Sequence, residues 1–240
     1  MHALLPSLLA GLATALGSLI VLLGRCPGRR ALAVTLGGAA GVMLAVVLLD
    51  LLPAAFRFGS AFETGAGFAL GLIILWGLDR LLSLGNETFR FNGKTAYRRL
   101  GYLIATGIAL HDLPEGIAIA GAYAAGGILG PLLALSIALH NIPEGIAAAT
   151  PLQMGGLRRR QVFFLNVIVS IFTPLGTLLG LFLIHLSPRH LAFLLALAAG
   201  AMTYLIKDEL IPAAHYQNPV WAWLGLTLGY LLLWFAQALK

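Results

Sequence analysis

The chain is a succession of long apolar stretches separated by short breaks. Each stretch is close to or longer than the roughly 20 residues that an α-helix needs to cross the hydrocarbon core of a bilayer. The eight stretches span residues 3–24, 31–56, 61–83, 99–125, 128–151, 162–186, 189–212 and 219–239. They predict an all-α membrane protein with eight transmembrane helices, and they leave no room for a separate soluble domain.

The composition excludes several other classes of protein. Apolar residues make up 60% of the chain and charged residues only 10%, whereas charged residues make up about 25% of an average soluble domain. A soluble enzyme and a disordered chain are therefore excluded. The net charge of +6 is typical of basic cytoplasmic loops in so apolar a chain, and we expect no nucleic-acid partner. The single cysteine, Cys26, excludes an intrachain disulfide and a cysteine-based zinc finger.

Lysine and arginine are distributed unevenly between the two sides of the predicted bundle. The breaks after the first, third and fifth stretches, together with the helix ends that flank them, carry 11 of them, and the opposite side carries 3. Positively charged loops are retained in the cytoplasm, so both termini are predicted to lie outside, which is the periplasm in a bacterium. The longest break, residues 84–98, is predicted to be a polar cytoplasmic loop.

Five ionisable groups near the middle of two predicted spans belong to two copies of one motif. The fourth stretch reads HDLPEGIA at 111–118, and the fifth reads HNIPEGIA at 140–147. Ionisable residues at bilayer depth are costly, and they usually face a cavity or a partner. A repeated motif in adjacent spans therefore indicates a functional site.

Spacing places the polar groups of each motif together. His111 and Glu115 are four residues apart and share one helix face, as do His140 and Glu144. Both motifs lie roughly 22 Å from the predicted turn near residue 127, at 1.5 Å per helical residue, so antiparallel helices bring them to one level. Imidazole nitrogen and carboxylate oxygen are ligands that suit zinc and other first-row divalent ions.

The alternative is that these side chains only hold two helices together. An interhelical hydrogen bond needs one polar pair and contributes well under about 1 kcal/mol on average. The two motifs together provide six polar groups: an imidazole, a carboxylate and a third polar group, Asp112 or Asn141, in each. Holding two helices together would not require so many. We therefore favour a metal site between the fourth and fifth helices.

At these residues the sequence resembles the ZIP family, the Zrt- and Irt-like divalent metal transporters, in its prokaryotic eight-helix branch. The resemblance covers essentially the whole chain and implies a single transmembrane transporter domain over residues 1–240. It also implies that one helix bundle moves relative to the other. The ligands it implies are His111, Glu115, His140 and Glu144, with Met43 of the second helix, and with Asp112 and Asn141 at an adjacent second position.

The chain departs from the family pattern in the sixth helix. Many relatives have a glutamate directly before Pro-Leu-Gly, where this chain has Thr173. A hydroxyl is a weaker ligand than a carboxylate, so binding of a second ion is expected to be weakened.

The predicted function is transport of a divalent metal cation toward the cytoplasm. Zn²⁺ is the expected substrate, and Cd²⁺, Fe²⁺ and Mn²⁺ are left open. The expected partners are the metal ions and the lipid bilayer of a bacterial inner membrane, and a homodimer is left open. The alternative is an intramembrane zinc-dependent hydrolase, which needs an open water position on the metal and a general base. The chain lacks His-Glu-x-x-His, so we expect no enzyme.

Overall fold

The computed structural model describes residues 2–24, 28–83, 93–124, 128–182 and 188–238, and all regular structure in these ranges is helical. The first half contains α1 (Leu4–Leu23), α2 (Arg29–Ala45), η1 (Val46–Leu51), α3 (Leu52–Phe58), α4 (Ala61–Ser83) and α5 (Gly93–Ala124). The second half contains α6 (Leu129–Met154), α7 (Arg159–Ser170), α8 (Phe172–Phe182), α9 (Pro188–Tyr204), η3 (Leu205–Leu210), α10 (Ile211–Gln217) and α11 (Pro219–Ala238).

Length and apolar composition make most of these helices candidates for membrane spans. Continuous helical segments form seven such candidates within the described residues. The eighth predicted stretch forms α11, whose described apolar part, Pro219–Phe235, is shorter. The all-helical prediction is confirmed, with seven spans supported by length and an eighth helix present.

The predicted start of the fourth span was wrong. Residues 93–98 were expected to belong to a polar loop, but they form the first turns of α5. Ala96 and Leu100 are buried on this segment, and Arg98 donates a hydrogen bond from Nε to the carbonyl of Gly155 at 2.6 Å. The helix therefore continues beyond its apolar part because residues of its polar end pack and form hydrogen bonds with the rest of the protein. The rest of the predicted loop, 84–92, lies outside the described residues.

Two spans contain a π-helical turn directly before a proline. In η1 the N–H of Leu52 donates to the carbonyl of Val47, and Pro53 follows. In η3 the N–H of Ile211 donates to the carbonyl of Ile206, and Pro212 follows. Proline lacks an N–H and crowds the preceding turn, and a wider turn relieves this. Each long span, 29–58 and 188–217, thus runs through its proline without ending.

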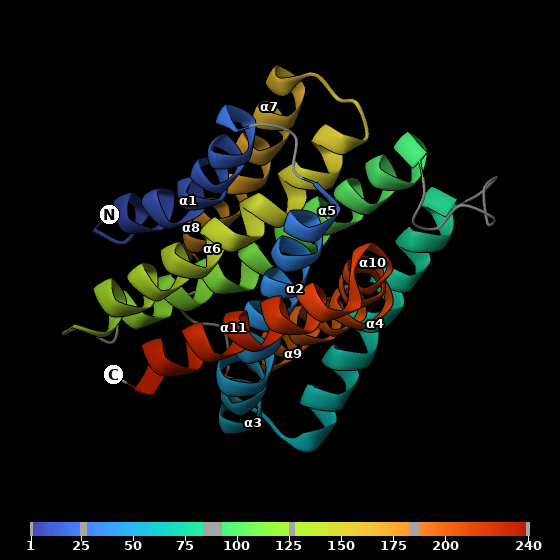
Figure 1. The fold of residues 1–240 in the computed structure, drawn as a ribbon. Helices are drawn as coiled ribbons and strands as arrows, with labels where there is room; N and C mark the ends of the chain where they lie inside the picture. The colour runs from blue at the N-terminus through green and yellow to red at the C-terminus, as the bar shows by residue number, and fades with distance from the viewer. Residues whose placement is uncertain (1, 25–27, 84–92, 125–127, 183–187, 239–240) are drawn as a thin grey trace.

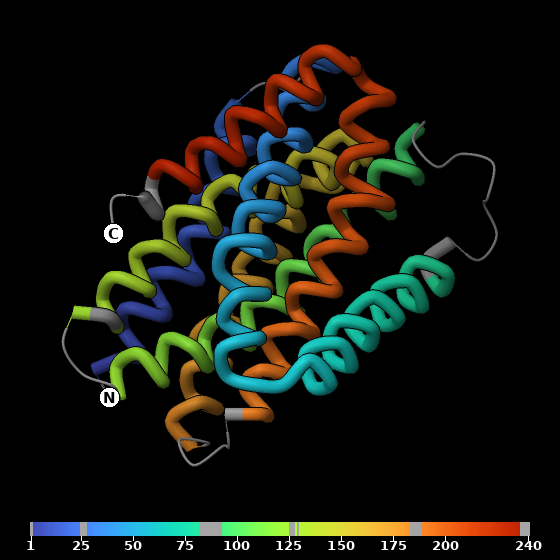
Figure 2. Tube along the Cα trace, turned by 90° about the horizontal axis from the view of Figure 1, so that it is seen from below, coloured from blue at the N-terminus to red at the C-terminus, as the bar shows by residue number. Residues whose placement is uncertain are grey.

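The helices pack as two bundles (Figure 1). The first, which we call the motif bundle, contains α1, α5, α6, α7 and α8. The second, which we call the partner bundle, contains α4, α11, the α2–η1–α3 span and the α9–η3–α10 span. The start of α1 and the end of α11 lie at the same end of the molecule (Figure 2).

Two glycines of the repeated motif lie where helices approach most closely. A Cβ at Gly116 of α5 would lie 2.0 Å from the carbonyl oxygen of Thr173 in α8. A Cβ at Gly145 of α6 would lie 1.9 Å from the carbonyl oxygen of Thr14 in α1. Only a residue without a side chain fits there, which is how small residues support helix packing in membranes. Each motif helix is thereby in close contact with another helix of its bundle: α5 packs against α8, and α6 packs against α1.

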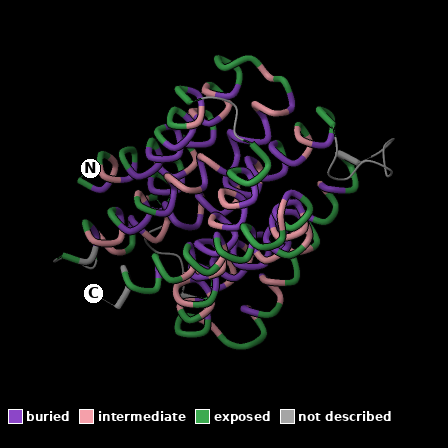
Figure 3. The backbone as a smooth tube through the Cα atoms, in the orientation of Figure 1, coloured by how far each residue is buried: buried purple, intermediate pink, exposed green. Residues whose placement is uncertain are grey.

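Burial follows this arrangement (Figure 3). Buried positions follow the inner faces of the helices and exposed positions the outer faces. The exposed set includes large apolar side chains such as Leu23, Phe62 and Phe182, while the buried set contains the polar residues of both motifs. This distribution is opposite to that of a soluble domain and fits a chain that is solvated by lipid.

Candidate metal centre

The two motifs meet face to face on α5 and α6. His111 Nε2 of the first motif lies 3.1 Å from Glu144 Oε2 of the second. His140 Nε2 of the second motif lies 3.2 Å from Glu115 Oε2 of the first. Each histidine therefore pairs with the glutamate of the other helix, and the two pairs repeat the same relation in opposite directions.

These four side chains are enclosed by protein. His111 and Glu144 are fully buried, and His140 and Glu115 each retain only 4% of their exposure. Buried charges are stabilised only when they are paired or bind a metal. The imidazoles and carboxylates of the two motifs thus lie within reach of one another.

The partners of the ring nitrogens show which atom of His111 faces the centre. Nδ1 lies 3.1 Å from the carbonyl oxygen of Gly107, which can only accept a hydrogen bond. Nδ1 therefore carries a proton, and Nε2 is the nitrogen directed at the carboxylates. Second partners of this kind fix the tautomer and orientation of histidines that bind metals. In His140 the Nδ1 atom is buried and has no hydrogen-bond partner among the described residues.

Asp112 lies beside the first pair. One ligand atom each from His111, Asp112 and Glu115 fall within 4.8 Å of one another, the spacing of a potential metal site. Asp112 Oδ1 is 3.5 Å from His111 Nε2. Both carboxylate oxygens of Asp112 are buried and lack a hydrogen-bond partner among the described residues, an arrangement that costs stability unless a cation or water satisfies it.

Asn141 and Thr173, the residues expected to affect a second ion, are both fully buried. Asn141 donates a hydrogen bond from Nδ2 to the carbonyl of Ala10 in α1 at 2.9 Å, which fixes the orientation of the amide. Its Oδ1 atom is buried without a partner among the described residues, as are Glu144 Oε1 and Thr173 Oγ1. Oxygen atoms of this kind suit divalent cations.

Met43 is the remaining predicted ligand. It lies buried in α2, and α2 packs against α6, the helix of the second motif. Its immediate surroundings are apolar, since it belongs to the main hydrophobic core. The other predicted ligands all belong to the two motifs. Met43 does not, and no described hydrogen bond or ion pair connects it to them.

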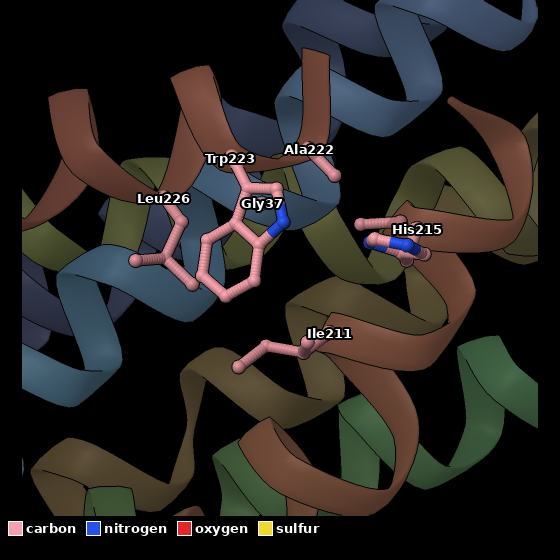
Figure 4. A pocket seen from close by; sticks show the side chains of 7 residues that line it. Gly37, Ile211, His215, Ala222, Trp223 and Leu226 are labelled. Carbon is pink, nitrogen blue, oxygen red and sulfur yellow. The ribbon is translucent and has the colours of Figure 1, made fainter. Parts of the chain in front are cut away.

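A small apolar hollow elsewhere contains none of the predicted ligands (Figure 4). It lies between α2, α10 and α11 and is lined by Gly37, Ile211, Ala214, His215, Ala222, Trp223 and Leu226. The rings of His215 and Trp223 meet edge to face, with centroids 6.4 Å apart. One imidazole among apolar side chains does not make a metal site.

Two groups of the centre were missed by sequence reasoning because they are backbone carbonyls. The carbonyls of Gly107 and Ala10 orient His111 and Asn141, respectively. The first lies one turn before its histidine, so a helical prediction could have found it. The second comes from α1 and has no signal in the sequence.

Comparison with known proteins identifies the family. Residues 92–237 match the family model described as ZIP Zinc transporter. The chain is 37% identical over 233 residues to a protein of Chlorobium luteolum named Zinc transporter ZupT, with 89% of this chain and 88% of the relative covered. The corresponding protein of Escherichia fergusonii is 38% identical over 226 residues, with 90% and 88% covered. That of Chlorobium limicola is 34% identical over 248 residues, with 95% and 93% covered. The chain therefore belongs to the ZIP family of zinc transporters.

Proposed function

We propose that this multi-pass membrane protein transports a divalent metal cation, with Zn²⁺ as its substrate, through the centre formed by the two motifs. The observation that carries the proposal is the reciprocal pairing of His111 with Glu144 and of His140 with Glu115. One cation between the two helices would contact ligands from both. The relatives named zinc transporters support this choice of substrate.

The donor atoms explain how such a substrate would be held. His111, His140, Glu115 and Glu144 supply nitrogen and oxygen ligands, the set that Zn²⁺ prefers. Met43 is proposed to add a thioether when α2 approaches, which would favour softer ions. Cd²⁺, Fe²⁺ and Mn²⁺ are therefore proposed as further substrates. Because the ion is cargo, the ligands have to release it as well as bind it.

Asp112 and Asn141 are proposed to form a second, weaker position for an ion. A ligand oxygen of Asp112 lies within 4.8 Å of ligand atoms of His111 and Glu115. The Oδ1 atom of Asn141 is buried and has no hydrogen-bond partner among the described residues. Thr173 would supply a neutral hydroxyl there. The second position therefore has one carboxylate fewer than it would have with glutamate in place of Thr173. Two divalent ions repel strongly at low dielectric. The second ion therefore binds weakly in this proposal.

The proposed direction is from outside to cytoplasm across a bacterial inner membrane. The arginine-rich breaks assign one end of the bundle to the cytoplasm. That end holds the start of α5 and the end of α6. Both termini are then outside, in agreement with their position at one end of the molecule.

The transport step is proposed to be a movement of the motif bundle relative to the partner bundle. The motif side chains are almost completely buried, so an ion held there is accessible to neither side until the helices part. The hydrolase alternative gains no support from the matched relatives, which are named transporters.

Zinc accumulation in sealed liposomes tests the proposal. The purified chain is reconstituted, radioactive Zn²⁺ is added outside, and the retained metal is measured against protein-free liposomes. Release by an ionophore shows that the metal is inside. Accumulation above the protein-free control supports transport, whereas none, or release of product from a peptide added instead, would contradict it.

A further inference from the structure

A second buried cluster of charges lies away from the motifs and joins the two bundles. Arg99 of α5 forms an ion pair with Asp79 of α4. Its guanidinium also holds Glu209 of η3 with two hydrogen bonds, from Nη2 to Oε1 at 2.9 Å and from Nη1 to Oε2 at 3.4 Å. Tyr204 donates its hydroxyl hydrogen bond to Asp79 Oδ2 at 2.7 Å. One residue of the motif bundle thus binds two carboxylates of the partner bundle.

The burial of this cluster makes the pairing strong. The side chain of Glu209 is fully buried, and those of Asp79 and Arg99 are 9% and 14% exposed. A forked guanidinium bond to a carboxylate is among the stronger polar contacts in proteins. Loss of Arg99 would remove the guanidinium that now pairs with both buried carboxylates, and breaking a buried ion pair in this way is strongly unfavourable.

A second polar link lies two residues earlier on the same helix. Gln217 of α10 donates from Nε2 to the hydroxyl of Tyr97 at 3.0 Å. Gln217 also accepts a hydrogen bond from Arg29 Nε of α2 at 3.3 Å. The first turns of α5 therefore connect to the partner bundle through two independent side chains.

The position of Arg99 relates the cluster to transport. It precedes His111 on the same helix by 12 residues, or about 18 Å at 1.5 Å per residue. It lies on the side that the charge count assigns to the cytoplasm. Since α5 carries both the motif and Arg99, any shift of the motif bundle against the partner bundle must break or exchange these contacts.

We infer that Arg99 is a latch between the two bundles, which closes the cytoplasmic side of the centre by binding Asp79 and Glu209 and must open before the cation can leave. The inference rests on the proposed function, because it assigns Arg99 a role in the movement that releases the substrate. Arg99 does not contact the substrate; it is a positioning residue for the bundles.

The neighbouring arginine provides a matched control. Arg98 lies on the same turn of α5 and has the same charge, but it binds the carbonyl of Gly155, the residue that follows α6, within its own bundle. Arg98→Gln therefore removes an arginine contact at the same end of α5 without cutting the link between bundles. A purely structural effect of losing an arginine there should appear in both variants.

Distances between spin labels on the two bundles test the latch without metal. In a Cys26→Ser background, one pair of labels at Arg158 and Val220 reports the cytoplasmic side. A second pair at Ile128 and Phe62 reports the outer side; the hydrophobic members of both pairs are well exposed. We expect Arg99→Gln to raise the fraction of long cytoplasmic distances about tenfold, as loss of one link in a two-state equilibrium does. Arg98→Gln should match the parent protein.

A variant with exchanged charges distinguishes loss of the ion pair from misfolding of the single variant. Arg99→Glu combined with Glu209→Arg keeps a cation between the same helices and should restore the parent distances. Unchanged cytoplasmic distances in folded Arg99→Gln would overturn the inference, as would long distances in the folded exchange variant. Because these distances are measured without metal, their result is independent of the zinc accumulation that tests the proposed function.

Discussion

Gly145→Ala should couple a packing defect to a loss of metal affinity. The added Cβ would lie 1.9 Å from the carbonyl oxygen of Thr14 and 2.8 Å from its carbon. An ordinary contact begins at 3.4 Å, so α6 has to move away from α1 by about 1.5 Å. Backbone atoms cannot rotate aside, and overpacking of this kind costs about 1–3 kcal/mol.

The same displacement moves part of the metal centre. His140 and Glu144 lie on the same helix within a few residues of the substitution. Ligand geometry has to be held to about 0.5 Å, and loss of ligand support typically lowers metal affinity by about 10–100-fold. We therefore expect a lower melting temperature in detergent, together with zinc binding that is weaker by at least about tenfold in calorimetry.

Gly121→Ala is the control for this substitution. A Cβ at Gly121 in α5 meets nothing within 4 Å, so alanine should leave stability unchanged or raise it by up to about 1 kcal/mol through its higher helix propensity. Zinc affinity should stay the same. If Gly145→Ala behaves like Gly121→Ala in both measurements, the close approach of α6 to α1 does not position the ligands.

Three further predictions concern topology, protons and the second ion. In a Cys26-free background, a cysteine at Ile128 should react with an impermeant thiol reagent in intact cells and one at Arg158 only after the membrane is opened; the reverse pattern would invert the topology. Zinc binding should weaken between pH 7 and pH 5, because protons compete for the imidazoles and carboxylates of both motifs, and tighter binding at pH 5 would refute this. Thr173→Glu should raise the number of ions bound at equilibrium toward two, whereas an unchanged count would mean that Thr173 only packs beside Gly116.

The sequence was sufficient to predict that the chain is helical, and the two motifs that it singled out lie next to each other in the structure. Apolar length defines a membrane helix almost without regard to the rest of the fold. Equal distance from one turn brings His111 and His140 to one level. The spacing of four residues placed each histidine beside the glutamate of its own helix, but the structure pairs it with the glutamate of the other. On facing helices, the histidine and the glutamate of each motif both point toward the other helix. Their partners therefore depend on how α5 and α6 pack, and the spacing of residues along one helix does not reveal this.

The ionic cluster at Arg99 shows what sequence patterns leave out. In the sequence, Arg99 was one of several arginines that set the topology. Its partners Asp79 and Glu209 come from two other helices, and no local pattern relates them to it. The π-helical turns of η1 and η3 were missed as well, although Pro53 and Pro212 were visible, because a proline can be accommodated in several ways.

Ion binding by two single variants and their combination tests the central claim, that both motifs hold one cation jointly. The variants are Glu115→Ala, Glu144→Ala and the double substitution, with Glu63→Gln, a carboxylate at the distant start of α4, as control. If the motifs share one ion, each single variant loses most high-affinity zinc binding and uptake, and the double variant is hardly worse, because residues of one unit are not additive. Glu63→Gln should match the parent protein. Single variants that each retain about half of the bound zinc, with a double variant that retains none, would show two separate sites and contradict the account.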